Sequence, residues 1–144
     1  MYLIQRRSEG ICKKKWFLSL NDVRIYVKEN PGWELYKATP VFEGWIEKKG
    51  DFNKERKKRY LVLTKNRLIY YNLENSGELT EKGEISLIQI SYLIPTMTGK
   101  DGFTFYYEGR TYDFETLDKT SWEWYNCIRD VKQVFHLYVN GNST

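Results

Sequence analysis

The feature that most constrains the fold of this chain is a series of short strand-like segments that ends in a change to helical periodicity. Between residues 42 and 116, runs rich in β-branched and aromatic residues alternate with turn-forming pairs such as Lys65-Asn66 and Glu108-Gly109. The spacing predicts seven strands, over residues 42–49, 57–64, 67–73, 83–87, 90–94, 103–107 and 110–115. Seven short strands about ten residues apart are typical of an antiparallel barrel or sandwich.

After residue 119 the hydrophobic pattern takes a helical period. Thr120 and Glu123 fit a capping box, in which a hydroxyl and a carboxylate three residues later bind amides at the start of a helix. One helical face then carries the apolar residues Trp124, Ile128, Val131 and Phe135. We expect this helix to end before Asn140-Gly141 and to close one end of the barrel. The predicted fold is therefore mainly β, a seven-stranded antiparallel barrel or sandwich capped by one C-terminal α-helix, with a β-rich extension at the N-terminus.

The charge of the chain is unevenly distributed. The net charge of +4 arises from 23 basic and 19 acidic residues, but residues 48–59 alone hold seven basic and two acidic ones. Residues 42–47 and 60–144 together hold eight basic and thirteen acidic residues. A concentrated basic segment on a mildly acidic body orients a protein toward an anionic surface or ligand, over distances of about 8 Å at physiological salt.

Several classes of function are disfavoured by the composition. Two cysteines without metal-ligand spacing, Cys12 and Cys127, and a single histidine, His136, argue against a disulfide scaffold, a zinc site and most histidine-dependent catalysis. No apolar run approaches the ~18 residues that a membrane span needs, and the apolar stretch in residues 1–7 is too short for a signal peptide. We therefore expect a cytosolic protein with no enzymatic activity, no metal and no cofactor.

The basic segment can build an anion site through strand geometry alone. Lys57 and Arg59 lie two positions apart in a predicted strand and therefore share a face, and a hairpin brings Lys48 beside them. Arg59 suits bidentate contact with a phosphate, whereas Lys48 provides a compact charge. The segment between the two strands adds four residues that we expect to contact a membrane surface, namely Lys49, Phe52, Lys54 and Arg56.

Several motifs, taken in order, carry a resemblance to a known family. They are Glu43-Gly44-Trp45-Ile46-Glu47-Lys48, Lys57-Lys58-Arg59-Tyr60-Leu61-Val62-Leu63, Leu68-Ile69-Tyr70-Tyr71, Gly83-Glu84-Ile85, and Trp124 with Ile128. Over residues 42–138 they resemble the first four strands and the closing helix of the pleckstrin homology (PH) domain. The resemblance implies the PH fold.

Within that family the chain is most similar to phosphoinositide-binding members, such as those of Tec kinases and cytohesins. Lys48 followed by Lys57-Lys58-Arg59 fits their basic signature. The resemblance implies that Lys48, Lys57 and Arg59 hold the headgroup phosphates and that Tyr70 and Lys82 add further contacts. The two-residue turn at 108–109 departs from relatives with a long insertion there, so the choice among phosphoinositides stays open.

The first 41 residues form an N-terminal extension that the resemblance does not cover. Residues 13–18 and 22–27 look like a strand pair that weakly echoes residues 57–71. Two interpretations are open: the tail of a preceding domain in a longer protein, which we favour, or part of a second PH-like hairpin. Apolar residues of the extension that we expect to pack against the barrel are Trp16, Phe17, Ile25 and Trp33.

The sequence thus predicts three regions, an extension over 1–41, a PH domain over 42–138 and a tail over 139–144. The expected function is a phosphoinositide-binding module that recruits a signalling or cytoskeletal adaptor protein, as a monomer, to the cytoplasmic face of the plasma membrane or endomembranes. The alternative is a PH-like protein-interaction module for a small GTPase or a peptide, to which the extension adds a protein contact. Nucleic-acid binding ranks last, because the body is acidic and no aromatic platform flanks the cations.

Overall fold

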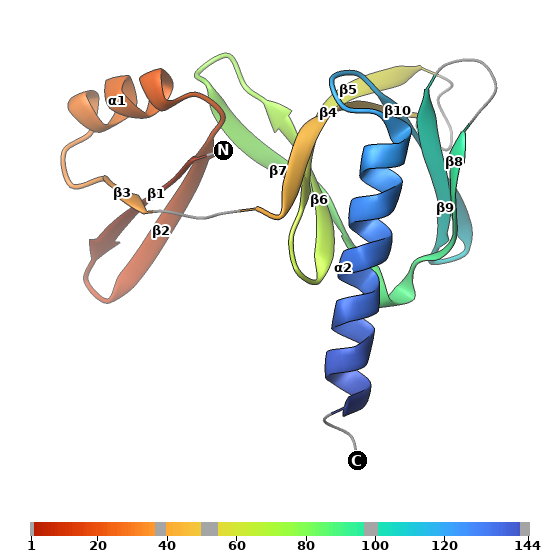
Figure 1. The fold of residues 1–144 in the computed structure, drawn as a ribbon. Coiled ribbons are helices and arrows are strands. Elements are labelled where there is room, and N and C mark those ends of the chain that lie inside the picture. The colour runs from red at the N-terminus through yellow and green to blue at the C-terminus, as the bar shows by residue number, and fades with distance from the viewer. Residues whose placement is uncertain (1, 37–39, 50–54, 97–100, 142–144) are drawn as a thin grey trace.

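The computed structural model describes residues 2–36, 40–49, 55–96 and 101–141, with the side chains of Tyr36 and of residues 135–141 excepted. Its ten strands form one antiparallel sheet in the order β3-β1-β2-β7-β6-β5-β4-β10-β9-β8 (Figure 1). The strands are β1 (Tyr2–Ser8), β2 (Ile11–Phe17), β3 (Glu34–Tyr36), β4 (Phe42–Lys49), β5 (Arg56–Leu63), β6 (Arg67–Leu73), β7 (Glu78–Ser86), β8 (Ser91–Thr96), β9 (Gly102–Tyr107) and β10 (Arg110–Thr116). The helices are α1 (Leu20–Glu29), α2 (Ser121–Gly141) and a 3-10 turn, η1 (Leu87–Gln89).

The seven strands expected from the sequence are β4 to β10, and most of their boundaries agree closely with the expectation. The exception is β7, which begins at Glu78 rather than at Gly83, because its first residues pair with both β6 and β2. The described chain has ten strands and two α-helices, which is three strands and one α-helix more than the sequence predicts for the PH region. The additional strands and the additional α-helix all belong to the N-terminal extension.

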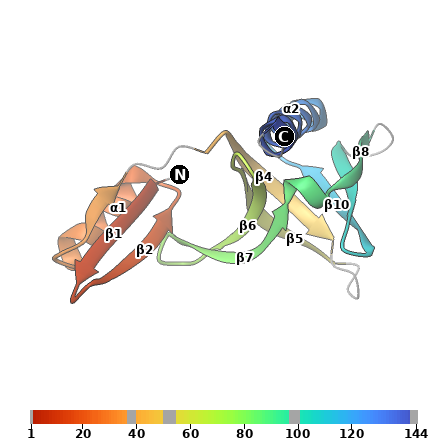
Figure 2. The same cartoon turned by 90° about the horizontal axis from the view of Figure 1, so that it is seen from below.

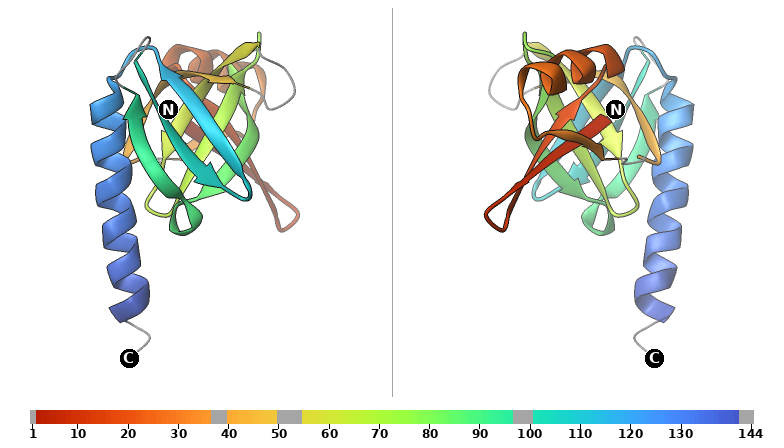
Figure 3. Two further views of the ribbon diagram at one scale, coloured as in Figure 1. Left: turned by 90° about the vertical axis from the view of Figure 1, so that its right-hand side faces the viewer. Right: turned by 90° about the vertical axis from the view of Figure 1, so that its left-hand side faces the viewer.

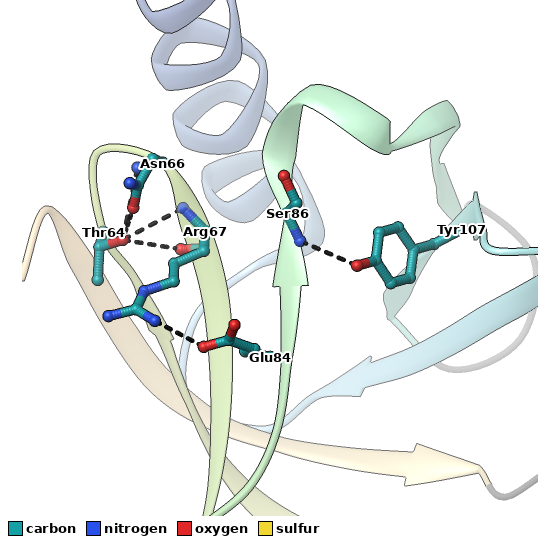
Figure 4. A network of polar contacts seen from close by, with 6 residues as sticks. All are labelled: Thr64, Asn66, Arg67, Glu84, Ser86 and Tyr107. Atoms are coloured by element: carbon teal, nitrogen blue, oxygen red, sulfur yellow. Dashed lines mark hydrogen bonds and ion pairs between the residues drawn. The ribbon is translucent and has the colours of Figure 1, made fainter.

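The sheet is open rather than closed into a barrel, but β4 to β10 curve around a shared interior (Figures 2 and 3). Alternate residues of these strands point inward, as the buried Ile46, Leu61, Phe105 and Phe114 show. A hydrogen bond spans this curved region, since the Ser86 amide in β7 donates to the Tyr107 hydroxyl in β9 at 3.4 Å (Figure 4). No helix among the described residues is both long and apolar enough to cross a bilayer.

The turn between β5 and β6 is held by side chains. Thr64 Oγ1 accepts a hydrogen bond from the Arg67 amide at 3.2 Å, and the Arg67 guanidinium pairs with the Glu84 carboxylate of β7 at 2.6 Å (Figure 4). Both contacts lie at the end of the strands far from the β4–β5 and β6–β7 hairpin loops. They therefore support the β5–β6 turn and join β6 to β7 at the end of the strands opposite those hairpin loops.

Helix α2 begins with the expected capping box. The Glu123 amide donates to Thr120 Oγ1 at 3.1 Å, and the Thr120 amide donates to Glu123 Oε2 at 2.8 Å, which lowers the pKa of the Glu123 carboxyl. Trp124 and Ile128 are fully buried against the inner face of the sheet, whereas Phe135 lies outside the described side chains. The expected end of the helix is wrong, because α2 continues to Gly141.

The expected strand over 22–27 is also wrong, because these residues belong to α1. Ser19 caps this helix by accepting a hydrogen bond from the Asn21 amide at 3.2 Å, and Asp22 places a negative charge in the first turn. The β-branched residues of the segment suggest a strand, but their spacing also fits a helix that buries Val23. Since β2 is followed by a helix, the echo of the β5–β6 hairpin is not present in the structure.

The N-terminal extension has a small core of its own. Phe17 and Trp33 are buried with Ile4 and Val23 under α1, rather than against the curved sheet as expected. Trp16 does pack on the outer face of the sheet. Ile25, the fourth of these apolar residues, is 49% exposed.

The extension joins the rest of the sheet through a short strand pairing. Only two residue pairs link β2 to β7, Trp16 with Leu79 and Phe17 with Glu78. The ammonium of Lys15 adds an ion pair with the Glu78 carboxylate at 3.0 Å. The extension is therefore attached beside the hairpin between β6 and β7 (Figure 1).

Two buried tyrosines on the outer face should make the protein less stable at alkaline pH. Burial raises the pKa of Tyr71 to about 12, with the nearby Glu81 adding to the shift, and burial also raises the pKa of Tyr60. Tyr71 in the unfolded chain ionises near 10.0, so the folded form holds its proton more tightly between pH 10 and 12. We therefore expect the contribution of Tyr71 to the free energy of unfolding to be fully present below pH 10 and to be lost as the pH rises toward 12.

Between pH 9 and 12 the wild type should lose more free energy of unfolding than Tyr71→Phe does. The expected difference between the two losses is about 2 kcal/mol. Urea unfolding of the wild type and of Tyr71→Phe at both pH values measures the difference. Equal alkaline losses in the two proteins would contradict the assignment to Tyr71.

Candidate anion-binding site on the inner face of the sheet

The hairpin of β4 and β5 brings three basic side chains to one face. Lys48 lies opposite Lys57 in the strand register, and Arg59 lies opposite the buried Ile46. Directly opposed residues of an antiparallel pair share a face, so all three side chains lie on the inner face, beyond the end of the apolar core. We call Lys48, Lys57 and Arg59 the inner-face cations. The structure therefore brings together the three residues that the sequence predicts as principal phosphate ligands.

The ammonium of Lys48 is positioned by two aromatic rings. Its Nζ lies 5.2 Å from the ring centroid of Tyr70 in β6 and 5.4 Å from that of Tyr112 in β10. Tyr70 reaches this position because it lies over Gly83 of β7, where a Cβ atom would overlap the Tyr70 hydroxyl. Contact with rings from two strands holds this charge at the rim of the core.

Arg59 is oriented by a neighbouring amide side chain. Its Nη1 donates to Asn72 Oδ1 of β6 at 3.2 Å and to the Lys58 carbonyl at 3.0 Å. Both contacts use one nitrogen of a group that has five N–H donors. The guanidinium therefore has a defined orientation and retains donors suited to bidentate contact with an anion.

Lys82, the fourth basic residue predicted for the site, is exposed at an irregularity of β7. Tyr70 pairs with Gly83 and Tyr71 with Glu81, so Lys82 is the extra residue of a bulge. Its charge, like that of Arg59, lowers the pKa of Glu74. Lys82 and Arg59 therefore both lie near Glu74.

A carboxylate also lies beside these cations. Asn72 Nδ2 donates to Glu74 Oε1 at 3.0 Å, and hydrogen bonds from Asn72 and Thr80 hold the pKa of Glu74 below its usual range, with smaller contributions from Lys82 and Arg59. Three residues at the site, Asn72, Glu74 and Tyr112, were not predicted from the sequence. The inner-face positions of Asn72 and Tyr112 could have been predicted, because each lies two residues from an inner-face aromatic residue in its strand. Glu74 lies beyond the end of β6, where strand alternation no longer applies.

The residues expected to contact a membrane surface have different positions. Lys49 is exposed at the end of β4, while Phe52 and Lys54 lie outside the described residues. Arg56 is the first residue of β5, and its guanidinium forms ion pairs with Asp113 at 3.3 Å and Glu115 at 3.4 Å in β10. The structure thus places Arg56 on the outer face, opposite the face of the inner-face cations.

One further basic side chain borders the site. The Arg110 guanidinium lies over the Tyr112 ring at 4.4 Å, on the inner face of β10, so Tyr112 contacts Arg110 as well as Lys48. Lys58 faces the other way and lies 4.5 Å from the centroid of Trp45 on the outer face.

No group of three or more His, Cys, Asp or Glu side chains in the described part of the chain is placed to hold a metal ion.

A groove of about 470 Å³ lies on the outer face, away from the inner-face cations. Its floor is formed by Val62, Ile69 and Leu79, and Trp16 of the extension forms one wall. Lys48, Lys57 and Arg59 do not line it. Of the inner-face cations, Lys57 is exposed, whereas Lys48 and Arg59 are half-buried at the rim of the sheet.

Comparisons with solved structures find several structures of one PH domain among the matches. The Slm1 PH domain in complex with D-myo-inositol 4-phosphate matches with a TM-score of 0.53 and 19% identity, over 66% of this chain and 97% of that one. The Slm1 PH domain in complex with phosphoserine matches with a TM-score of 0.53 and 20% identity, over 65% and 96%. An inhibitor-bound Vav1 structure matches with a TM-score of 0.56 and 14% identity, over 66% of this chain and 27% of that one.

At these identities the structural matches show the fold alone. A comparison with curated protein sequences finds no match. The model of the PH domain family, however, matches residues 40–133, which is well over half of the chain. Together with the β4–β10 sheet and the closing helix α2, this match shows that the chain belongs to the PH domain family.

Proposed function

We propose that the inner-face cations bind the phosphates of a phosphoinositide headgroup and thereby recruit the protein to a membrane. The observation that carries the proposal is the convergence of Lys48, Lys57 and Arg59 on one face of the β4–β5 hairpin, with Lys48 between two tyrosine rings. Several cations at one rim suit a ligand with closely spaced phosphates. Lys82 and the Tyr70 hydroxyl supply additional donors at the edge of the same site.

The mechanism is reversible docking without a chemical step. Arg59 offers paired N–H donors to one phosphate, and Lys48 and Lys57 offer ammonium groups to a second. Lys49 and Lys54 of the β4–β5 hairpin then attract anionic lipids, each by about 1 kcal/mol near the surface. In this proposal Phe52 contacts the headgroup layer, and Arg56 adds positive charge at the hairpin while it remains paired with Asp113.

The comparisons support the ligand class. The Slm1 PH domain structures contain inositol 4-phosphate or phosphoserine, both of which carry one phosphate group. By analogy with those domains, this chain binds phosphorylated headgroups at the cytoplasmic face of the plasma membrane or endomembranes, as a monomeric, non-catalytic part of a signalling or adaptor protein.

Chemical-shift mapping by NMR with soluble inositol phosphates tests the location of the site. We expect the amides of β4 and β5 near Lys48 and Arg59, and the Arg59 side-chain Nε, to shift in a saturable manner. The amides of Ile69 and Leu79 on the outer face serve as internal controls and should not shift. Shifts confined to the outer face, or no saturable shifts, would contradict the proposal.

A second candidate function is binding of a protein partner, and the outer-face groove favours it. Its apolar floor and the wall contributed by Trp16 are of a kind that peptide side chains occupy. This function predicts partner binding that survives the loss of Lys48 and Arg59 and is reduced by Leu79→Ala. Retention of the partner by Lys48→Ala/Arg59→Ala in a pull-down, with no binding to phosphoinositide vesicles by the wild type, would make it the better description.

A further inference from the structure

Glu74 lies in a turn that holds its backbone in place. Its amide donates to the Glu78 carbonyl at 2.9 Å, and its carbonyl accepts from the Gly77 amide at 3.0 Å. Gly77 has a φ of 87° and lies against the Asp22 carboxylate of α1, so that a Cβ atom there would lie 2.7 Å from Asp22. The turn is therefore held by its own backbone hydrogen bonds and by the close packing of Asp22 of the N-terminal extension against Gly77.

The side chain of Glu74 is also held. It accepts a hydrogen bond from Asn72 Nδ2 at 3.0 Å and another from Thr80, and Asn72 in turn accepts from Arg59 Nη1 at 3.2 Å. One amide side chain thus links the carboxylate directly to the arginine that we propose as a phosphate ligand. The charges of Lys82 and Arg59 are close enough to stabilise the ionised form of Glu74. A fixed negative charge is therefore part of the site.

We propose that Glu74 is a specificity-determining residue of the headgroup site, because its charge weakens binding more for headgroups with several phosphates than for headgroups with one. The proposal rests on the proposed function of the inner-face cations. A headgroup that reaches Arg59 and Lys82 with additional phosphates brings negative charge toward the Glu74 carboxylate, and the repulsion grows with the number of phosphates. A headgroup with one phosphate can bind between Lys48, Lys57 and Arg59 with less of this repulsion.

The fixed position of Glu74 makes this discrimination possible. A mobile surface carboxylate can turn toward solvent and lose its influence on a bound anion. Glu74 would have to break its hydrogen bonds with Asn72 and Thr80 to do so, and the turn that carries it is braced by Asp22. The extension therefore contributes to headgroup selectivity through the turn that it supports.

The variant Glu74→Gln tests the proposal, because glutamine keeps the shape and the hydrogen-bond acceptor but removes the charge. We expect its affinity for a soluble inositol trisphosphate to rise by about tenfold and its affinity for inositol 4-phosphate by about twofold, in titration calorimetry at low salt. The difference between the two ligands should shrink as salt is added, because it is electrostatic.

Glu81→Gln is the matched control. It makes the same change of charge in β7, but Glu81 pairs with the outer-face residue Tyr71 and lines the outer-face groove. We expect it to change both affinities equally and only slightly. Equal gains for both ligands in Glu74→Gln, or equal behaviour of the two variants, would overturn the role of Glu74. Absence of binding by the wild type and by both variants would instead overturn the headgroup site itself.

Discussion

The double variant Lys48→Ala/Arg59→Ala should bind phosphoinositide vesicles about a hundredfold more weakly than the wild type, while it remains folded. Each substitution removes a charged donor, and hydrogen bonds to charged groups contribute about 1.5–3 kcal/mol each. Both side chains lie at the rim beyond the apolar core, so the fold does not depend on their burial. Vesicle co-sedimentation at ~0.15 M salt measures the loss, and circular dichroism confirms the fold.

The matched control is Lys58→Ala/Arg67→Ala. Like the test variant it removes one lysine and one arginine, but from the outer face. Lys58 lies over Trp45, and Arg67 pairs with Glu84 at the far end of β6. Because neither residue points to the inner face, we expect this variant to lose only the small attraction that comes from net charge. Similar losses in both double variants would mean that binding follows total charge and not a defined site.

The second large effect concerns the closing helix. Trp124→Ala should lower the free energy of unfolding by about 4 kcal/mol, because it leaves a cavity in the core. The Trp124 ring is fully buried, with the ring of Phe42 in β4 at 4.7 Å and that of Phe103 in β9 at 6.0 Å. The Trp124 ring therefore joins α2 to two strands of the curved sheet. The expected loss is a large fraction of the free energy of unfolding of a small domain. Urea unfolding measures the change.

Trp122 provides an internal control on the same helix. Its side chain is 47% exposed, and its ring packs against Tyr125 of the same helix at 5.6 Å. We expect Trp122→Ala to lower the free energy of unfolding by less than about 1 kcal/mol. A loss from Trp124→Ala no greater than that from Trp122→Ala would contradict the role of Trp124 in closing the sheet.

Periodicity accounts for what could be predicted of the PH region. Strand alternation identified β4, β5 and the shared face of Lys57 and Arg59, because side chains two apart in a strand cannot point to opposite faces. The capping box located the start of α2 for a similarly local reason, the hydrogen bonds between Thr120 and Glu123. These features depend on residues that are close in the sequence or in one hairpin.

The features that were missed depend on contacts between distant segments. The segment 22–27 was expected as a strand, yet burial of Val23 beside Ile4 and Phe17 favours a helix there. Likewise, Tyr112 meets Lys48 only because β10 pairs with β4, and Glu74 meets Arg59 only through Asn72. A single sequence does not specify such pairings, so the second ring at Lys48 and the carboxylate beside Arg59 emerged only from the structure.

The most direct test of the central claim compares vesicles that have equal surface charge but different lipid identity. One set contains a single phosphoinositide, and the other contains enough additional phosphatidylserine to match its charge. With the wild-type chain at ~0.15 M salt, a defined headgroup site predicts co-sedimentation with at least one phosphoinositide well above the phosphatidylserine control. Equal binding to all vesicles of equal charge, or no binding to any, would contradict the claim that Lys48, Lys57 and Arg59 form a headgroup site.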